Sequence, residues 1–248
     1  ELVYEAGFDF LECSVTSLHP EGNETQFRET VLEQYRNCPV PVEVFNGFLP
    51  GDMKIVGRAV NWDRIQRYVQ SALQRVSWIG GDTVVFGSGS ARTIPEGFSR
   101  ETAEQQIVAF LHAVADCAER LSITVVIEPL RKKESNVINS IAEAVELARK
   151  VDRPSVRVLA DFYHMDEEKE PLSHLVTHSD YLHHVHVADS ERMAPGTGSY
   201  PYQSFVDHLK QAGYNGRLSV ECRWKDFARE INKCREYLEQ CFHTPGMN

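Results

Sequence analysis

The chain has 248 residues, of which 42% are hydrophobic and 25% are charged, and its formal net charge is -10. This acidic balance disfavours binding to a phosphate backbone, so we expect no nucleic-acid partner and instead small molecules or cations. No window approaches eighteen apolar residues, so we expect no membrane partner. Six cysteines without a CxxC pair, and no secretory signal before them, favour a reducing compartment, for which we expect the cytoplasm.

Hydrophobic periodicity and turn residues predict a strict alternation of strands and helices. In chain order they predict a helix tail at 1–6, a strand at 8–15, a helix at 24–37, a strand at 40–49, a helix at 61–79 capped by Asn61, a strand at 83–86 and a loop at 87–92. A helix at 99–121, a strand at 123–130, a helix at 141–151, a strand at 156–160 and a helix within 171–181 follow. A strand from Leu182, a helix at 202–212, a strand at 217–222 and a helix at 227–242 complete the pattern.

Such alternation without a linker predicts one domain, residues 1–248, built on a parallel sheet. Eight strand-helix units close a (β/α)8 TIM barrel, and the pattern supplies seven strands. We therefore expect a TIM barrel whose first strand is missing from the numbered chain, with an open doubly wound sheet as the competing architecture.

The strand that begins at Leu182 has an unusual polar face. Side chains alternate along a strand, so His184 and His186 share one face while Val185 and Val187 share the other. A strand buried on both sides is normally apolar throughout. The paired imidazoles therefore indicate a polar interior site.

Four predicted strands end with a side chain that can bind a metal ion: Glu128, Asp161, His186 and Glu221. A single acid at a strand end more often caps a helix or forms an ion pair. Four such residues at the carboxyl ends of strands in one barrel instead favour a metal site. Carboxylates and one imidazole suit one divalent ion, Mn²⁺ above all, with Mg²⁺, Co²⁺ or Zn²⁺ as alternatives.

The loop at 87–92, Gly-Ser-Gly-Ser-Ala-Arg, makes Arg92 a candidate for binding a phosphate or carboxylate of a substrate. An ordinary turn explains the loop equally well. The loop lacks the Gly-Lys-Ser/Thr ending of a Walker motif.

Four segments resemble the xylose isomerase-like (β/α)8 barrels, in the branch of ketose 3-epimerases, hydroxypyruvate isomerase and inosose dehydratase. They are the Ile-Glu-Pro-Leu at 127–130, the Leu-Ala-Asp-Phe-Tyr-His at 159–164, the His-Val-His-Val-Ala-Asp at 184–189 and the Val-Glu at 220–221. The offsets of Glu134, His164 and Arg192 from the metal-binding residues match the ketose 3-epimerase pattern. The resemblance implies that these three residues bind the substrate, and it places Glu12 near the substrate, with an ion pair to an arginine as the plain alternative.

The resemblance also implies a reaction. Glu128 and Glu221 would act as base and acid on opposite faces of a sugar or sugar phosphate whose carbonyl the ion polarises, most simply as in a ketose 3-epimerase. An inosose-type dehydratase or an aldose-ketose isomerase uses the same ligands, so the ligands alone leave the reaction open. A homo-oligomer is compatible with the sequence.

Two further functions fit parts of the sequence less well. An apurinic endonuclease shares similar segments but needs a three-metal cluster with histidines from early strands, and this chain has no histidine between His19 and His112. A non-catalytic sugar-binding barrel would not need the second carboxylate of the Glu128 and Glu221 pair.

Overall fold

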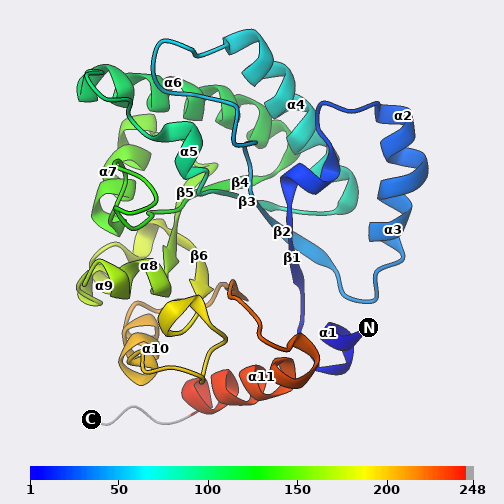
Figure 1. Ribbon diagram of the computed structural model, residues 1–248, viewed down its shortest axis with the longest axis vertical. Coiled ribbons are helices and arrows are strands. Elements are labelled where there is room, and N and C mark those ends of the chain that lie inside the picture. The colour runs from blue at the N-terminus through cyan, green and yellow to red at the C-terminus, as the bar shows by residue number, and fades with distance from the viewer. Residues whose placement is uncertain (244–248) are drawn as a thin grey trace.

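The computed structural model describes residues 1–243. Seven parallel strands form one sheet in which each strand pairs with the next along the chain, and the sheet curls into a nearly closed barrel (Figure 1). The strands are β1 (Leu11–Ser14), β2 (Val42–Asn46), β3 (Thr83–Phe86), β4 (Thr124–Ile127), β5 (Val156–Asp161), β6 (Leu182–Val187) and β7 (Arg217–Val220). This sequential order excludes a doubly wound sheet, whose strand order reverses at a switch point. The predicted TIM-barrel fold is confirmed.

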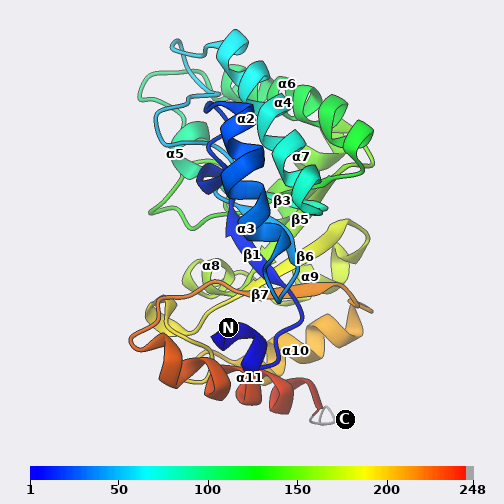
Figure 2. The same cartoon turned by 90° about the vertical axis from the view of Figure 1, so that its right-hand side faces the viewer.

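The helices surround the sheet (Figures 1 and 2). They are α1 (Leu2–Glu5), α2 (Glu24–Gln26), α3 (Leu32–Arg36), α4 (Trp62–Ile79), α5 (Gly89–Arg92), α6 (Arg100–Ala118), α7 (Ile141–Val151), α8 (Phe162–Glu167), α9 (Ser173–Thr177), α10 (Tyr202–Gln211) and α11 (Phe227–His243). Single turns lie at η1 (Val15–Leu18), η3 (Glu119–Leu121), η4 (Ser179–Tyr181) and η5 (Ser190–Arg192), and a π-helical segment at η2 (Phe27–Val31). Among residues 1–243, no helix has both the length and the hydropathy that a membrane span requires.

The bounds of the long helices follow from their capping residues. Asn61 Oδ1 accepts a hydrogen bond from the Arg64 amide at 3.0 Å, as predicted, and this satisfies one of the free amides that open α4. Gly80 ends the helix with a φ of 104°, a conformation that glycine adopts without strain. The same N-cap bond is made by Ser99 for α6 and by Ser140 for α7.

Three predicted segments differ in detail. The helix expected at 24–37 contains the π-helical segment, next to the point where the Thr30 hydroxyl donates to the Gln26 carbonyl. Such back-bonding bends helices. The loop expected at 87–92 includes the turn α5, and the helix expected within 171–181 consists of the short α9 and η4.

The edges of the sheet are β1 and β7. A cavity of about 270 Å³ lies between them, lined by residues of both strands such as Leu11 and Leu218, and by Trp224 and Ile231 from the C-terminal part. The seven predicted strands are all found, and an eighth strand ahead of β1 stays a prediction.

The interior of the barrel is built in layers. Val44, Val85, Val126 and Leu159, one each from β2 to β5, form a small buried cluster against which Phe10 packs. Side chains two residues further along each strand point to the same interior, one layer nearer the carboxyl ends. This layer contains Glu128 after Val126, and Asp161 after Leu159. The apolar layer is thus the floor of the polar site.

Candidate metal centre and active site

Four strands bring the predicted ligands to one point. Glu128 directly follows β4, Asp161 ends β5, His186 lies in β6 and Glu221 directly follows β7. One ligand atom from each residue lies within 4.8 Å of the others. His186 Nδ1 is 3.3 Å from Glu128 Oε1 and 3.3 Å from Glu221 Oε2. A barrel wall positions all four side chains because each one leaves its strand on the interior face.

The two carboxylate oxygens of Asp161 have different roles. Oδ1 caps α8 by accepting hydrogen bonds from the amides of Tyr163, at 2.8 Å, and His164. Oδ2 faces the site, 3.6 Å from His164 Nε2. Asp161 is therefore a helix cap, as the simpler explanation predicts, and it is also one of the four candidate ligands.

The imidazole of His186 has a carboxylate near each ring nitrogen. Burial lowers the pKa of His186, but Glu12 and Glu221 outweigh it and hold the pKa well above its usual value, so a cation at Nδ1 would take the place of a proton. Nε2 of the ring lies 3.0 Å from Glu12 Oε2, and a carboxylate there accepts the ring N–H. In the neutral ring, Nδ1 then carries the lone pair that faces Glu128 and Glu221. A histidine that donates its other N–H to a carboxylate is the usual arrangement of a metal ligand.

The electrostatics of the cluster favour a cation. Burial raises the pKa of Asp161 to about 6 and also raises the pKa of Glu128, since each carboxylate is cut off from water and lies beside the others. Burial acts the same way on Glu221, but His186 and Arg192 outweigh it and hold the pKa of Glu221 below its usual value. Glu128 Oε1 and His186 Nδ1 are buried and have no hydrogen-bond partner. Oxygen and imidazole donors of this kind fit a divalent ion.

Comparisons with known proteins identify the family of the chain. A family model described as "Xylose isomerase-like TIM barrel" matches residues 1–241. The chain belongs to the xylose isomerase-like TIM barrel family. It is 31% identical over 230 residues to the L-ribulose 3-epimerase of Methylomonas sp. (strain DH-1), covering 91% of this chain and 76% of the relative.

Two further proteins are similar to the chain, one in sequence and one in fold. The 3-dehydro-D-guloside 4-epimerase of Escherichia coli (strain K12) is 27% identical over 184 residues, which cover 71% of this chain and 70% of that protein. The crystal structure of the D-psicose 3-epimerase with D-tagatose from Clostridium cellulolyticum H10 superposes with a TM-score of 0.84 at 20% identity, covering 98% of this chain and 92% of that one. The predicted family is confirmed.

The three residues that the family resemblance assigns to the substrate lie at the rim of the cluster. Arg192 Nη2 donates to Glu221 Oε2 and lies 3.9 Å from Asp161 Oδ2. Glu134 Oε1 is 3.9 Å from Arg192 Nη1 and accepts a hydrogen bond from Arg131. The backbone of Glu191 and Arg192 has φ near 60°, so the turn η5 is held in a left-handed conformation that aims Arg192 at the site.

His164 is held as a hydrogen-bond donor. Its Nδ1 accepts a hydrogen bond from the Arg131 amide at 3.3 Å, so the neutral ring carries its hydrogen on Nε2. That Nε2 is buried without a hydrogen-bond partner. Burial lowers the pKa of His164, which keeps the ring neutral near pH 7.

Two predicted substrate contacts are placed differently by the structure. Arg92 is fully buried and donates to the carbonyls of Phe86, at 2.9 Å, and Glu128, at 2.6 Å. This contradicts the predicted contact with a substrate, because the buried guanidinium instead links the carboxyl ends of β3 and β4. Glu12 is bonded to His184 and His186 behind the ligands, in place of either a substrate or an arginine.

Sequence reasoning missed three residues that shape the site. Asn46, at the end of β2, donates to Glu221 Oε1 at 3.2 Å. The ring of Tyr163 lies near two guanidinium groups, with Arg192 at 5.1 Å and Arg131 at 5.0 Å from its centroid. Gly87 leaves room for the carboxylate of Glu128. A polar residue at the end of a strand was the available signal for Asn46, and nothing local singles out the other two.

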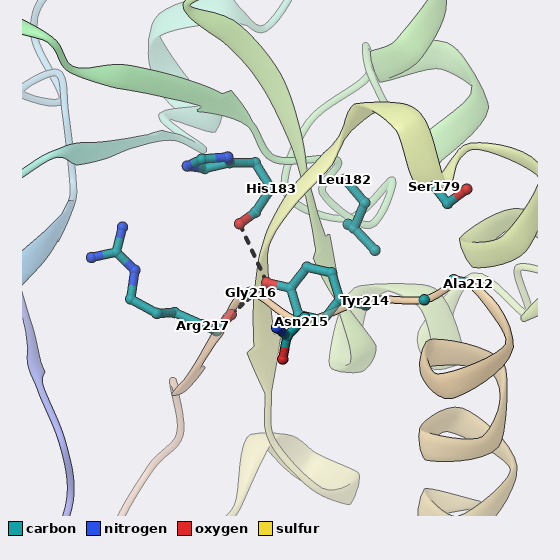
Figure 3. Close-up of a pocket in the computed structure, with 9 residues that line it drawn as sticks. Ser179, Leu182, His183, Ala212, Tyr214, Asn215, Gly216 and Arg217 are labelled. Carbon is teal, nitrogen blue, oxygen red and sulfur yellow. Dashed lines mark hydrogen bonds between the residues drawn. The ribbon is translucent and has the colours of Figure 1, made fainter.

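A cavity of about 480 Å³ lies elsewhere, around the amino ends of β6 and β7. Figure 3 shows that the side chains of His183 and Arg217 extend to the side away from Ser179 and Ala212. Arg217 instead pairs with Glu43 at 2.7 Å and with Asp82. The cavity therefore lacks the converging polar groups that the carboxylate cluster provides.

Proposed function

We propose that the protein is a divalent-metal-dependent sugar epimerase of the ketose 3-epimerase type. The observation that carries the proposal is the cluster of Glu128, Asp161, His186 and Glu221, with ligand atoms within 4.8 Å of one another. The two relatives, named as an L-ribulose 3-epimerase and a 3-dehydro-D-guloside 4-epimerase, both have names that describe inversion of one carbon of a sugar.

The four residues would hold one divalent ion, with Mn²⁺ favoured because the donors are mainly carboxylate oxygens. When bound, the ion supplies Lewis-acid polarisation of a sugar carbonyl and so makes the hydrogen on the adjacent carbon more acidic. Glu128 and Glu221 come from β4 and β7 and reach the substrate space from different parts of the barrel wall. One carboxylate removes the proton and the other delivers a proton to the opposite face, which inverts the carbon.

The rim residues bind and orient the sugar. The Nε2–H of His164 and the guanidinium of Arg192 donate hydrogen bonds to sugar oxygens, and Glu134 accepts one from a hydroxyl group. Arg192 also holds the Glu221 carboxylate together with Asn46. Orientation by such contacts lowers the barrier because the reacting carbon is kept beside both carboxylates.

A substrate panel tests this proposal. Purified protein is incubated with Mn²⁺ and with L-ribulose, D-psicose, D-tagatose or their phosphate esters, and both epimers and dehydration products are measured. We expect epimer formation that chelation by EDTA abolishes and added Mn²⁺ restores. Dehydration products alone would instead assign a dehydratase, and the absence of any product or solvent proton exchange would leave a sugar-binding protein.

A further inference from the structure

His186 has carboxylates at both of its ring nitrogens. Nε2 faces Glu12 at 3.0 Å, and Nδ1 faces Glu128 and Glu221 at 3.3 Å each. A neutral imidazole has one N–H and one lone pair, so it can satisfy only one of the two sides as a donor. A cation can bind at Nδ1 only when the ring carries its single hydrogen on Nε2.

Glu12 favours this tautomer by its position. With the hydrogen on Nε2, the ring donates to Glu12 and turns the Nδ1 lone pair toward the other ligands. With the hydrogen on Nδ1, the ring would donate to Glu128 or Glu221 and would oppose a lone pair to the buried carboxylate of Glu12. The second arrangement blocks the metal position, and the carboxylate of Glu12 disfavours it.

Glu12 is itself firmly held. The register of β1 against β2 shifts between Leu11 and Glu12, and such irregularities re-aim side chains near functional sites. Its Oε2 also lies 3.1 Å from His184 Nε2, which in turn is 3.0 Å from the Ser219 hydroxyl. The His184 ring packs edge-on against His186, with centroids 5.2 Å apart. The side chains of Glu12, His184 and His186 are each at least nine-tenths buried.

We infer that Glu12 is a positioning residue that fixes His186 as an Nδ1 ligand for a divalent cation, with His184 and Ser219 holding the carboxylate in place. The inference rests on the proposed function, since it concerns the same metal position. It replaces the predicted contact of Glu12 with substrate by an action through His186.

Metal binding without substrate tests the inference. Manganese affinity is measured by calorimetry for the wild type, Glu12→Gln and Glu12→Asp, with Glu170→Gln as the matched control. Glu170 is another buried carboxylate that pairs with a histidine, His174, at 2.8 Å. We expect about 10- to 100-fold weaker binding for Glu12→Gln, as for other supporting residues, partial recovery for Glu12→Asp and unchanged binding for the control.

A spectroscopic measurement on the wild type makes the test independent of how the variants fold. In the zinc-loaded protein, long-range ¹H–¹⁵N correlations should show the hydrogen of His186 on Nε2 and none on Nδ1. A hydrogen on Nδ1, or equal manganese affinity of wild type and a folded Glu12→Gln, would overturn the inference and leave the proposed function standing. A wild type that binds no divalent ion would overturn both.

Discussion

Gly87 shows how the site depends on a missing side chain. A Cβ at this position would lie 1.9 Å from Glu128 Oε2, far inside van der Waals contact. The neighbouring backbone is fixed by Arg92, which donates to the Phe86 and Glu128 carbonyls, so the strand ends cannot move apart to make room. A single methyl group therefore has to displace the carboxylate.

The substitution Gly87→Ala should weaken Mn²⁺ binding by at least about tenfold, comparable to the loss of a supporting residue. Gly51→Ala is the control, because its Cβ would meet only Ser90 Oγ at 3.9 Å. Calorimetric titration of both variants measures the effect. Equal Mn²⁺ affinity of Gly87→Ala and the wild type would show that metal binding does not depend on the present position of the Glu128 carboxylate.

Arg192→Ala should separate substrate binding from metal binding. The substitution removes the guanidinium at the rim and with it one charged hydrogen bond to the sugar. We therefore expect KM to rise by about 10- to 100-fold, the equivalent of one such bond. Metal content, measured by mass spectrometry of the dialysed protein, should stay that of the wild type. Loss of the ion would show that Asn46 alone does not hold Glu221 in place, and the two functions would not separate.

At the scale of elements, the segment after β6 is organised around Asp189. Its carboxylate accepts hydrogen bonds from the amides of Ser190 at 2.8 Å, Gly196 at 3.0 Å and Tyr200 at 3.1 Å. These bonds close the segment into a loop that includes η5 and therefore Arg192. The strained left-handed backbone at Arg192 persists because the loop around it is held.

Asp189→Ala should loosen this loop while leaving the barrel intact. Three amides lose their acceptor, at a cost of about 1 to 3 kcal/mol for each one left buried and unpaired. We expect faster amide hydrogen exchange over residues 190–200 and a raised KM, with Mn²⁺ affinity unchanged. Asp207→Ala, on the surface of α10, is the control. Unchanged exchange in the loop would contradict the assigned role of Asp189.

At the scale of the whole molecule, the site joins four successive strands. The proposed ligands lie in or directly after β4, β5, β6 and β7, which are distant in sequence and adjacent in the sheet. The unfolded chain cannot assemble them, so an ion that binds them stabilises only the folded state.

Thermal unfolding measures this linkage. Mn²⁺ at a hundred times its Kd should add about 2.7 kcal/mol of stability, which corresponds to a rise in Tm of roughly 5–10 °C for a chain of this size. Glu221→Gln should lose most of that rise. An equal rise in the variant would mean that the ion binds elsewhere.

The fold and the positions of the four candidate ligands could be predicted from the sequence, whereas the contacts around the site could not. Period-two alternation links Val126 to Glu128 and Leu159 to Asp161, and parallel strands bring their ends together, so local patterns suffice for this layer. The partners of Glu12 come from residues far along the chain: His184 and His186 lie more than 170 positions from Glu12. The alternation along a strand predicts the direction of a side chain but does not predict which residues that side chain contacts.

Solvent deuterium tests the paired-carboxylate chemistry most directly. The manganese-loaded protein is incubated in D2O with the ketose that the panel identifies, and deuterium is located in product and recovered substrate by NMR. We predict that the product carries deuterium at the inverted carbon and that Glu128→Gln and Glu221→Gln each abolish turnover while remaining folded. Inversion without solvent deuterium, or full activity in either variant, would contradict the assignment of Glu128 and Glu221 as the two proton-transfer groups.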